Sequence, residues 1–392
     1  MINNLKGRRK ILKYIIIYLF IFIVIDFSIG SIRNPKIPGV YHPYYHHDIK
    51  AMFSGKLRWG NEYPMYTNSL GFKDRINREI SLQSDKYRIL FIGDSITEGV
   101  GVPYTETFVG VIENRVDLEK VELLNAGVIS YSPKLYYLKI KYLLEILGLK
   151  IDEIIVFIDI SDIQDELVYE SFISKENNKG KAIIRDVDSL LKENSITYYF
   201  FRNTVFCRNC KILKYMRGEV KKFYNKIKSL FDNINEFKNL DSTTIVERGN
   251  NFDFNTIYEN DNKSRYSWTD NKAIYNNWGR RGMMLAQTNM KKLTDLCKIN
   301  GIRLNIVIYP WPYQIQKRDL NGLHVSEWTK FSENNGIKLL NLFPLFINDK
   351  PVDLILANYF IEGDVHWNRL GHKLIANSLF DKFFLKYRMD DN

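Results

Sequence analysis

The chain is poor in cysteine and lacks two common motifs of enzymes. It has only three cysteines in 392 residues, and two of them, Cys207 and Cys210, have the Cys-x-x-Cys spacing. This spacing fits incidental thiols, one local disulfide or a redox pair, but it supplies too few ligands for a zinc site. No glycine-rich phosphate loop is present, and Thr97 stands where a Gly-x-Ser-x-Gly elbow requires glycine. The sequence therefore disfavours phosphate-loop enzymes and elbow-type hydrolases.

A strong positive charge is also missing from most of the chain. The formal net charge is +11, but five lysines and arginines lie within the first 13 residues. The rest is only mildly basic, which fits anionic glycans or lipid headgroups as well as any other acidic partner. We therefore expect no binding to nucleic acid.

The longest apolar run is close to the N-terminus. Residues 14–25 are uninterrupted apolar, and the run continues to Ile32 with one aspartate and two serines as its main polar breaks. Because basic residues precede it and stay in the cytoplasm, we predict a cytoplasmic tail over 1–10 and a single-pass anchor in the cytoplasmic membrane over 11–32. The remaining chain is then extracytoplasmic. A cleaved signal peptide is the alternative, because small residues follow the run.

Beyond the anchor, two regions show little regular α/β pattern. Residues 33–86 have little periodicity, and we expect an extended juxtamembrane segment packed on the surface of a domain. Its histidines 42, 46 and 47 lack a framework of carboxylates, so no metal site is expected there. Residues 166–280 are rich in lysine, asparagine and aromatic residues and contain helical stretches, which predicts a helical insertion.

The rest of the chain predicts a doubly wound α/β domain in two halves, 87–165 and 281–392. Apolar strands alternate with amphipathic helices at the spacing of parallel βαβ units. In the first half the expected strands are 87–93, 121–127 and 153–161, and the expected helices are 106–116 and 133–147. In the second half the expected strands are 303–310 and 337–344, and the expected helices are 282–302 and 369–384.

A serine, a histidine and an aspartate occur at the ends of these elements. The first strand stops on Gly93-Asp94-Ser95, which presents Ser95 at the carboxyl edge of the sheet, where α/β enzymes place their chemistry. About 270 residues later, Asp364-Val365-His366 precedes the last helix. A hydroxyl, an imidazole and a carboxylate are the parts of a nucleophilic serine site.

These blocks resemble the SGNH (GDSL-type) hydrolase superfamily over roughly residues 87–165 and 300–384. The resemblance rests on the serine block, on Asn125-Ala126-Gly127 after the second strand, and on the Asp-x-His block. The Asp-x-His-Trp spacing is also similar to that of membrane-associated SGNH-like proteins that handle acetyl groups on exopolysaccharides, such as the alginate acetylation proteins. The resemblance implies a three-layer α/β/α flavodoxin-like fold with a mostly parallel sheet.

The resemblance also implies roles for individual residues. Ser95 attacks an acyl carbonyl, His366 takes its proton and Asp364 orients the imidazole. The oxyanion hole uses the backbone N–H groups of Ser95 and Gly127 together with a side chain of a third block.

The third block departs from the pattern of the family. Asp159-Ile160-Ser161-Asp162 replaces Gly-x-Asn-Asp, so Ser161 is the nearest substitute donor and Asn125 an alternative. We also expect Asp94, Asn125 and Trp311 to contribute to substrate binding. For Trp311, which lies in a Tyr-Pro-Trp-Pro segment after a strand, ordinary packing is an equal alternative.

The sequence thus predicts a membrane-anchored serine esterase that removes O-acyl groups, acetyl above all, from an extracytoplasmic glycan or another acyl ester. The mechanism implies no metal and no organic cofactor. One alternative is an O-acyltransferase that uses the same serine, with a partner membrane protein as acyl donor. A second alternative is a silent glycan-binding or scaffold protein, which the missing asparagine of the third block motivates.

Overall fold

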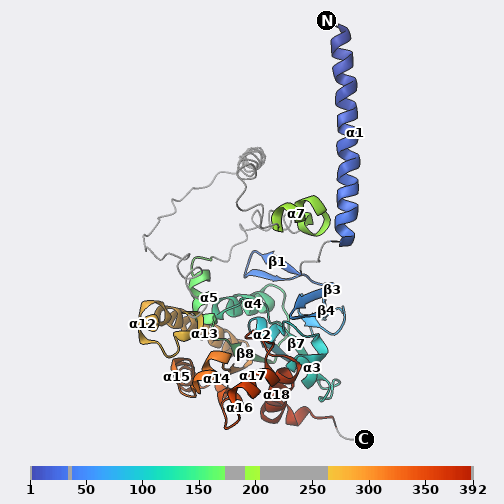
Figure 1. The fold of residues 1–392 in the computed structure, drawn as a ribbon. Helices are drawn as coiled ribbons and strands as arrows, with labels where there is room; N and C mark the ends of the chain where they lie inside the picture. The colour runs from blue at the N-terminus through green and yellow to red at the C-terminus, as the bar shows by residue number, and fades with distance from the viewer. Residues whose placement is uncertain (1, 34–37, 173–189, 204–263, 390–392) are drawn as a thin grey trace, which may run out of the picture. The chain divides into compact units, whose positions relative to one another are not determined.

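The computed structural model describes residues 2–33, 38–172, 190–203 and 264–389 (Figure 1). The chain divides into two compact units. The first comprises residues 1–37 and 186–254, and the second comprises 38–185 and 255–392. Cys207, Cys210 and most of the expected insertion lie outside the described residues.

The first unit contains the apolar helix α1 (Ile2–Arg33) and the short helix α7 (Ile196–Asn203). Residues Lys13–Arg33 are long and apolar enough to cross a membrane, and a signal sequence would meet the same description. The carboxylate of Asp26 on α1 accepts hydrogen bonds from the hydroxyl of Ser195 (2.5 Å) and from the backbone N–H of Thr197 (2.8 Å). Asp26, the polar break in the apolar run, is therefore hydrogen-bonded by residues at the start of α7.

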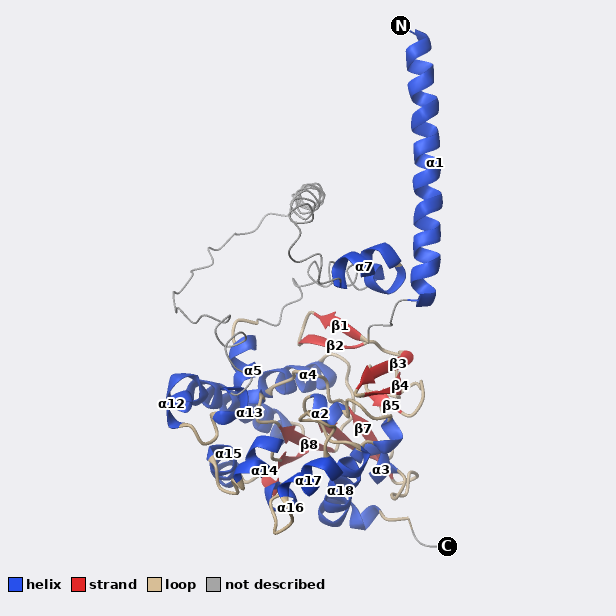
Figure 2. Ribbon diagram, viewed as in Figure 1, coloured by secondary structure: helices blue, strands red, loops and turns tan. Residues whose placement is uncertain are grey.

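The second unit is built on a mostly parallel sheet (Figure 2). Its five parallel strands lie in the order β10 (Lys338–Asn341), β9 (Arg303–Ile308), β8 (Glu153–Ile158), β6 (Tyr87–Ile92) and β7 (Val121–Asn125). When the five strands are numbered along the chain and read from β7 to β10, the order is 2-1-3-4-5, so β6 is the first strand and lies between β7 and β8. The direction of winding changes between β6 and β8, and ligands of doubly wound sheets bind at such a switch point. The predicted α/β fold with a mostly parallel sheet is confirmed.

Three antiparallel strands extend this sheet beyond β7, where the sequence predicted only an extended segment. They are β5 (Lys73–Asp74), β4 (Asn61–Thr67) and β3 (Ser54–Trp59), and a separate hairpin pairs β1 (Gly39–His42) with β2 (His46–Ile49). In β4, Tyr63, Met65 and Thr67 are buried at alternate positions. Pro64 and Tyr66 stand between them, so no alternation of apolar and polar residues marks this strand in the sequence.

Helices cover both faces of the sheet (Figure 2). On one face α3 (Phe108–Glu113) packs against α18 (Arg369–Leu379), and on the other α13 (Arg280–Ile299) packs against α4 (Pro133–Glu145) and α5 (Asp162–Tyr169). Right-handed crossovers require this division, because the winding reverses after β7. The remaining described helices are α2 (Ser95–Glu98), α11 (Ser264–Ser267), α12 (Lys272–Ile274), α14 (Pro312–Lys317), α15 (Leu323–Asn335), α16 (Phe343–Phe346) and α17 (Val352–Tyr359).

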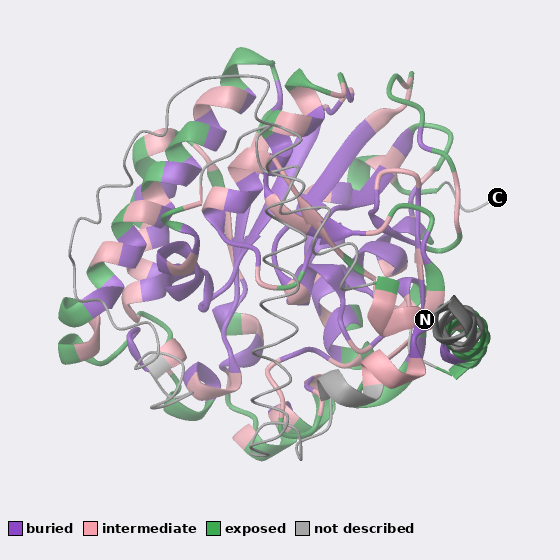
Figure 3. Ribbon diagram, turned by 90° about the horizontal axis from the view of Figure 1, so that it is seen from above, coloured by how far each residue is buried: buried purple, intermediate pink, exposed green. Residues whose placement is uncertain are grey.

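The core of this unit lies around the two central strands (Figure 3). All six residues of β8 are buried, and in β6 only Tyr87 is partly exposed. Phe108 of α3 stacks on Phe157 of β8 with ring centroids 4.6 Å apart. Continuous apolar strands are typical of parallel sheets with both faces covered, which explains why these strands were visible in the sequence.

Candidate active site

Ser95 begins the short helix α2 directly after β6. The carboxylate of Asp94 accepts the backbone N–H of Ile96 at 2.9 Å and so caps this helix. At Gly93 a Cβ atom would lie 2.1 Å from Oγ1 of Thr97, so only glycine allows the tight turn. The turn leaves Ser95 partly exposed while its neighbours on both sides are buried.

A tight turn brings Asp364 and His366 together before α18. The N–H of Ile361 donates to the carbonyl of His366 (2.9 Å), and the N–H of Asp364 donates to the carbonyl of Ile361 (3.0 Å). The N–H of His366 in turn donates to Oδ1 of Asp364 at 3.0 Å. The chain bends back here, and the aspartate reaches its histidine through an Asx-type turn.

The structure brings Ser95, His366 and Asp364 into one hydrogen-bonded chain. Nε2 of His366 lies 2.8 Å from Oγ of Ser95, and Nδ1 lies 2.5 Å from Oδ1 of Asp364. An ionised carboxylate only accepts hydrogen bonds, so Nδ1 carries the proton and Nε2 is left to accept from the serine. Burial alone would raise the pKa of Asp364, but the hydrogen bond and charge of His366 lower it to about 2. This is the arrangement of nucleophile, base and orienting acid.

Trp59, at the end of β3, also contacts this chain, and the sequence analysis missed it. Its indole N–H donates to Oδ2 of Asp364 at 2.8 Å. Its ring lies edge to face with the ring of His366, with centroids 5.1 Å apart. Trp59 belongs to the segment without clear periodicity, and no local motif marks it.

Gly127 and Asn125 lie beside α2, as the resemblance implies for the second block. The amide of Asn125 donates to the carbonyl of Thr97 at 2.9 Å, and its oxygen accepts the N–H of Gly127 at 3.2 Å. At Gly127 a Cβ atom would lie 2.4 Å from the backbone nitrogen of Glu98, so glycine permits the close approach to α2. Asn125 is buried, so it joins two loops instead of facing a substrate.

In the third block, the side chain of Ser161 faces the interior because it bonds to Asp159. The hydroxyl of Ser161 donates to Oδ1 of Asp159 at 2.6 Å. Oδ2 of the same carboxylate accepts the hydroxyl of Tyr309 (2.9 Å) and the indole N–H of Trp311 (2.7 Å). Ser161 and Trp311 are both buried, because the aspartate that replaces the glycine of the family draws their donors to itself. Their expected places in the oxyanion hole and the substrate pocket are not what this geometry provides.

Asp94, Asp159 and Asp162 form a buried acidic cluster behind Ser95. Their nearest ligand atoms all lie within 4.8 Å of one another, which makes them the one group in the described part of the chain with metal-ligand spacing. Burial, followed by repulsion from Asp159, raises the pKa of both Asp94 and Asp162 well above the ordinary range. Hydroxyl and indole groups already donate to the cluster, so protons and neutral donors balance it. Asp94 is buried within it and does not reach a substrate surface.

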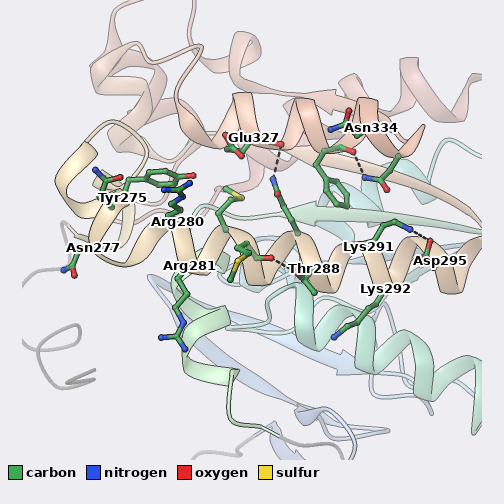
Figure 4. Close-up of a pocket in the computed structure, with 16 residues that line it drawn as sticks. Tyr275, Asn277, Arg280, Arg281, Thr288, Lys291, Lys292, Asp295, Glu327 and Asn334 are labelled. Atoms are coloured by element: carbon green, nitrogen blue, oxygen red, sulfur yellow. Dashed lines mark hydrogen bonds and ion pairs between the residues drawn. The ribbon is translucent and has the colours of Figure 1, made fainter. Parts of the chain in front are cut away.

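Two surface cavities lie near Asp364: the lining of one includes Asp364 itself, and the lining of the other includes Trp59, which donates to Asp364. One of about 430 Å³ is lined by Trp59, Gly101 and Ile361, and another of about 600 Å³ is lined by Phe360 and Asp364 among others. A larger cavity, of about 1020 Å³, lies between α13 and α15 (Figure 4). It contains no member of the triad, and its charged residues include the ion pair of Lys291 and Asp295.

No family model and no curated protein sequence matches the chain. Solved structures do match it. A lipolytic protein of the G-D-S-L family from Veillonella parvula has 14% identity and a TM-score of 0.37, with coverage of 76% of this chain and 98% of the other. A psychrotrophic esterase from Pseudoalteromonas has 13% identity, a TM-score of 0.37 and coverage of 77% and 100%. An acetylxylan esterase from Geobacillus stearothermophilus has 11% identity, a TM-score of 0.36 and coverage of 77% and 96%. These TM-scores are too low for the likeness to assign a function to this chain.

Proposed function

We propose that the chain is an SGNH-type serine esterase whose triad is Ser95, His366 and Asp364. The observation that carries the proposal is the continuous chain of hydrogen bonds from Oγ of Ser95 to the carboxylate of Asp364. Its position after β6, at the switch point of the sheet, is where doubly wound folds bind ligands. The separation of 2.8 Å between serine and histidine argues against a silent scaffold, which has no need to keep the two side chains within hydrogen-bond reach.

The proposed reaction proceeds through an acyl-enzyme. Oγ of Ser95 attacks the acyl carbonyl carbon while its proton passes to Nε2 of His366. The imidazolium, held by Asp364, then gives that proton to the oxygen of the leaving alcohol as the ester C–O bond breaks. Water attacks the acyl-enzyme with His366 again as base, which releases the carboxylic acid and restores Ser95.

The oxyanion of the tetrahedral intermediate needs donors that are already in place. We assign this role to the backbone N–H groups of Ser95 and Gly127, the two donors that the resemblance supplies on the main chain; the N–H of Gly127 would be shared with Oδ1 of Asn125, to which it donates at 3.2 Å. The side-chain donor of the third block is absent from this assignment because Ser161 donates to Asp159. A hole with two donors is expected to give slower chemistry than one with three.

The substrate class follows from the predicted location. A chain anchored in the cytoplasmic membrane with an extracytoplasmic body meets acylated polysaccharides of the cell envelope, and acetyl is the acyl group that the local resemblance favours. The mechanism places no demand on the alcohol beyond a hydroxyl leaving group. We therefore propose O-acetyl groups of an extracytoplasmic glycan as the substrate.

The first experiment is hydrolysis of a chromogenic acetyl ester by the full-length chain in detergent. Parent protein, Ser95→Ala and His366→Ala are compared, with correct folding of each verified by circular dichroism. We expect each substitution to lower kcat/KM by at least about 10³-fold. Equal turnover by the parent and Ser95→Ala would falsify the assignment of the serine.

The alternative of an O-acyltransferase uses the same serine but a sugar hydroxyl in place of water. The same assay separates the two, because in transfer an added oligosaccharide raises ester consumption and lowers the fraction released as free acid. If the added sugar changes neither quantity, hydrolysis is favoured. Transfer would also require an acyl donor, for which a partner membrane protein is the natural source.

A further inference from the structure

The tip of the β3–β4 hairpin lies between the two loops that carry the triad. Trp59 pairs with Asn61 across Gly60, which has a positive φ of 70° and so allows a one-residue turn. Gly101 follows the helix of Ser95, and a Cβ atom there would lie 2.5 Å from Ile361 and 3.3 Å from the carbonyl of Trp59. Ile361 begins the turn that holds Asp364. The hairpin therefore packs on both halves of the site at once.

Trp59 uses this position to contact the acid of the triad. Oδ1 of Asp364 is occupied by the ring and backbone of His366, and Oδ2 accepts the indole N–H. The side chain of Asp364 is 26% exposed, so without the indole its Oδ2 would be open to water. A directed N–H group fixes the rotation of the carboxylate, whereas water exchanges and leaves it freer.

We propose that Trp59 is a positioning residue that acts through Asp364, so that the segment before the α/β domain completes the active site. The inference rests on the proposed function of the triad. Trp59 does not exchange protons with the substrate. It holds the carboxylate in the orientation that aligns His366 toward Ser95, and misalignment of a base by a fraction of an ångström is costly for catalysis.

The test compares Trp59→Phe with Arg58→Ala in the full-length chain. Phenylalanine keeps an aromatic ring beside His366 but removes the donor, and Arg58 is the exposed neighbour on the same strand. We expect Trp59→Phe to lower kcat about tenfold with KM and Tm unchanged, and Arg58→Ala to match the parent. In an Asp364→Ala background the same substitution should have no further effect, because its only route to the reaction is gone.

Two results would overturn the inference. Parent kinetics in Trp59→Phe would show that the hydrogen bond has no part in positioning, and an equal loss in both backgrounds would show that Trp59 does not act through Asp364. If the parent itself shows no Ser95-dependent turnover, the proposed function is wrong, and this result is distinct from the two above.

A second measurement tests the contact without turnover. In protein labelled with ¹⁵N at its indoles, the resonance that disappears in Trp59→Phe identifies Trp59. We expect this resonance to move upfield in Asp364→Asn, because an amide is a weaker acceptor than a carboxylate. An unchanged resonance would exclude the hydrogen bond and with it the positioning role, whether or not the enzyme is active.

Discussion

At the scale of single residues, the site holds carboxyl groups in opposite states. Asp364 is half-buried; burial by itself raises its pKa, but the hydrogen bonds and charge of His366, together with the hydrogen bond of Trp59, outweigh burial and bring the pKa to about 2. Asp94 and Asp162 are fully buried beside Asp159, and burial with like charge raises the pKa of both. Asp364 is therefore ionised at neutral pH, while Asp94 and Asp162 behind Ser95 favour their protonated forms. Environment, not residue type, sets these states.

The first prediction concerns Asp162, whose burial is only partly compensated. Oδ2 accepts the hydroxyl of Tyr136 (2.8 Å) and the N–H of Asp159 (3.1 Å), while Oδ1 is buried with no partner in the described part of the chain. In Asp162→Asn the amide oxygen keeps both bonds and the NH₂ group faces the neighbouring carboxylates. We expect a gain of about 1–2 kcal/mol in the free energy of unfolding at neutral pH.

The raised pKa of Asp162 decides how the stability difference between parent and Asp162→Asn changes with pH. A raised pKa in the folded state means that the parent is most stable where Asp162 is protonated in both states, and loses stability as the pH rises above the ordinary carboxyl value of about 4. The gain in Asp162→Asn should therefore be small near pH 4 and grow toward neutral pH. Urea unfolding at both pH values measures it, with the exposed Asp85→Asn as control. A loss of stability at neutral pH would mean that Asp162 is ionised and well held.

The hydrogen-bonded chain of Ser95, His366 and Asp364 could be anticipated from the sequence, but the contact of Trp59 with it could not. Ser95 follows a strand whose apolar run is continuous, and Asp364 and His366 stand two positions apart before an amphipathic helix. The hydrogen bond between Asp364 and His366 joins residues two positions apart, and the strand β6 sets the position of Ser95. Trp59 meets Asp364 across 305 positions of sequence, and nothing in its neighbourhood announces that contact.

At the scale of elements, the short strand β5 links the antiparallel extension to the serine loop. Its Lys73 is buried, and the ammonium donates to the carbonyls of Gly99 and Val102, both at 2.7 Å. Burial lowers the pKa of Lys73 to about 8, with Glu98 opposing the shift. The lysine is thus still mostly charged at neutral pH and ties down the chain that leaves α2. Two residues of strand carry no periodicity, so β5 could be found only from its pairing with β4 and β7.

The second prediction is that Lys73→Met destabilises the fold and impairs the site together. The substitution fills the space, but it removes the ammonium donor from the buried carbonyls of Gly99 and Val102, leaves Gly99 with only the long bond from the N–H of Val102 (3.4 Å), and takes from Glu98 the cation that lowers its pKa most. We expect a loss of about 2–4 kcal/mol in the free energy of unfolding, together with a lower kcat for ester hydrolysis. Lys56→Met on β3, where the exposed lysine pairs with Glu62, is the matched control and should leave Tm unchanged. Parent-like stability in Lys73→Met would show that water replaces the ammonium.

At the scale of the whole molecule, the apolar helix α1 makes hydrogen bonds with a segment far away in the sequence. Its Asp26 pairs with Ser195 and Thr197, across 169 and 171 positions of sequence. At Gly30 a Cβ atom would lie 2.0 Å from the carbonyl oxygen of Asn194, so α1 also permits a close approach one turn later. An ionisable residue in an apolar helix is costly in lipid unless it is paired. The region expected as a helical insertion thus returns to the segment expected as the anchor, a link that hydropathy alone does not reveal.

The last prediction follows from the way Asp26 caps α7. Its carboxylate accepts the backbone N–H of Thr197 at 2.8 Å and the hydroxyl of the same residue at 2.6 Å, as an N-cap residue would. In Asp26→Leu these donors lose their acceptor, and we expect amides in the first turn of α7 to exchange hydrogen about fivefold faster, as the loss of a cap predicts. Hydrogen exchange measured by mass spectrometry on the full-length chain in lipid nanodiscs tests this. Ser28→Ala is the control, because Ser28 bonds only within α1, to the carbonyl of Val24. Unchanged exchange in Asp26→Leu would mean that α7 is held by its apolar face, and that the polar break in α1 serves some other partner.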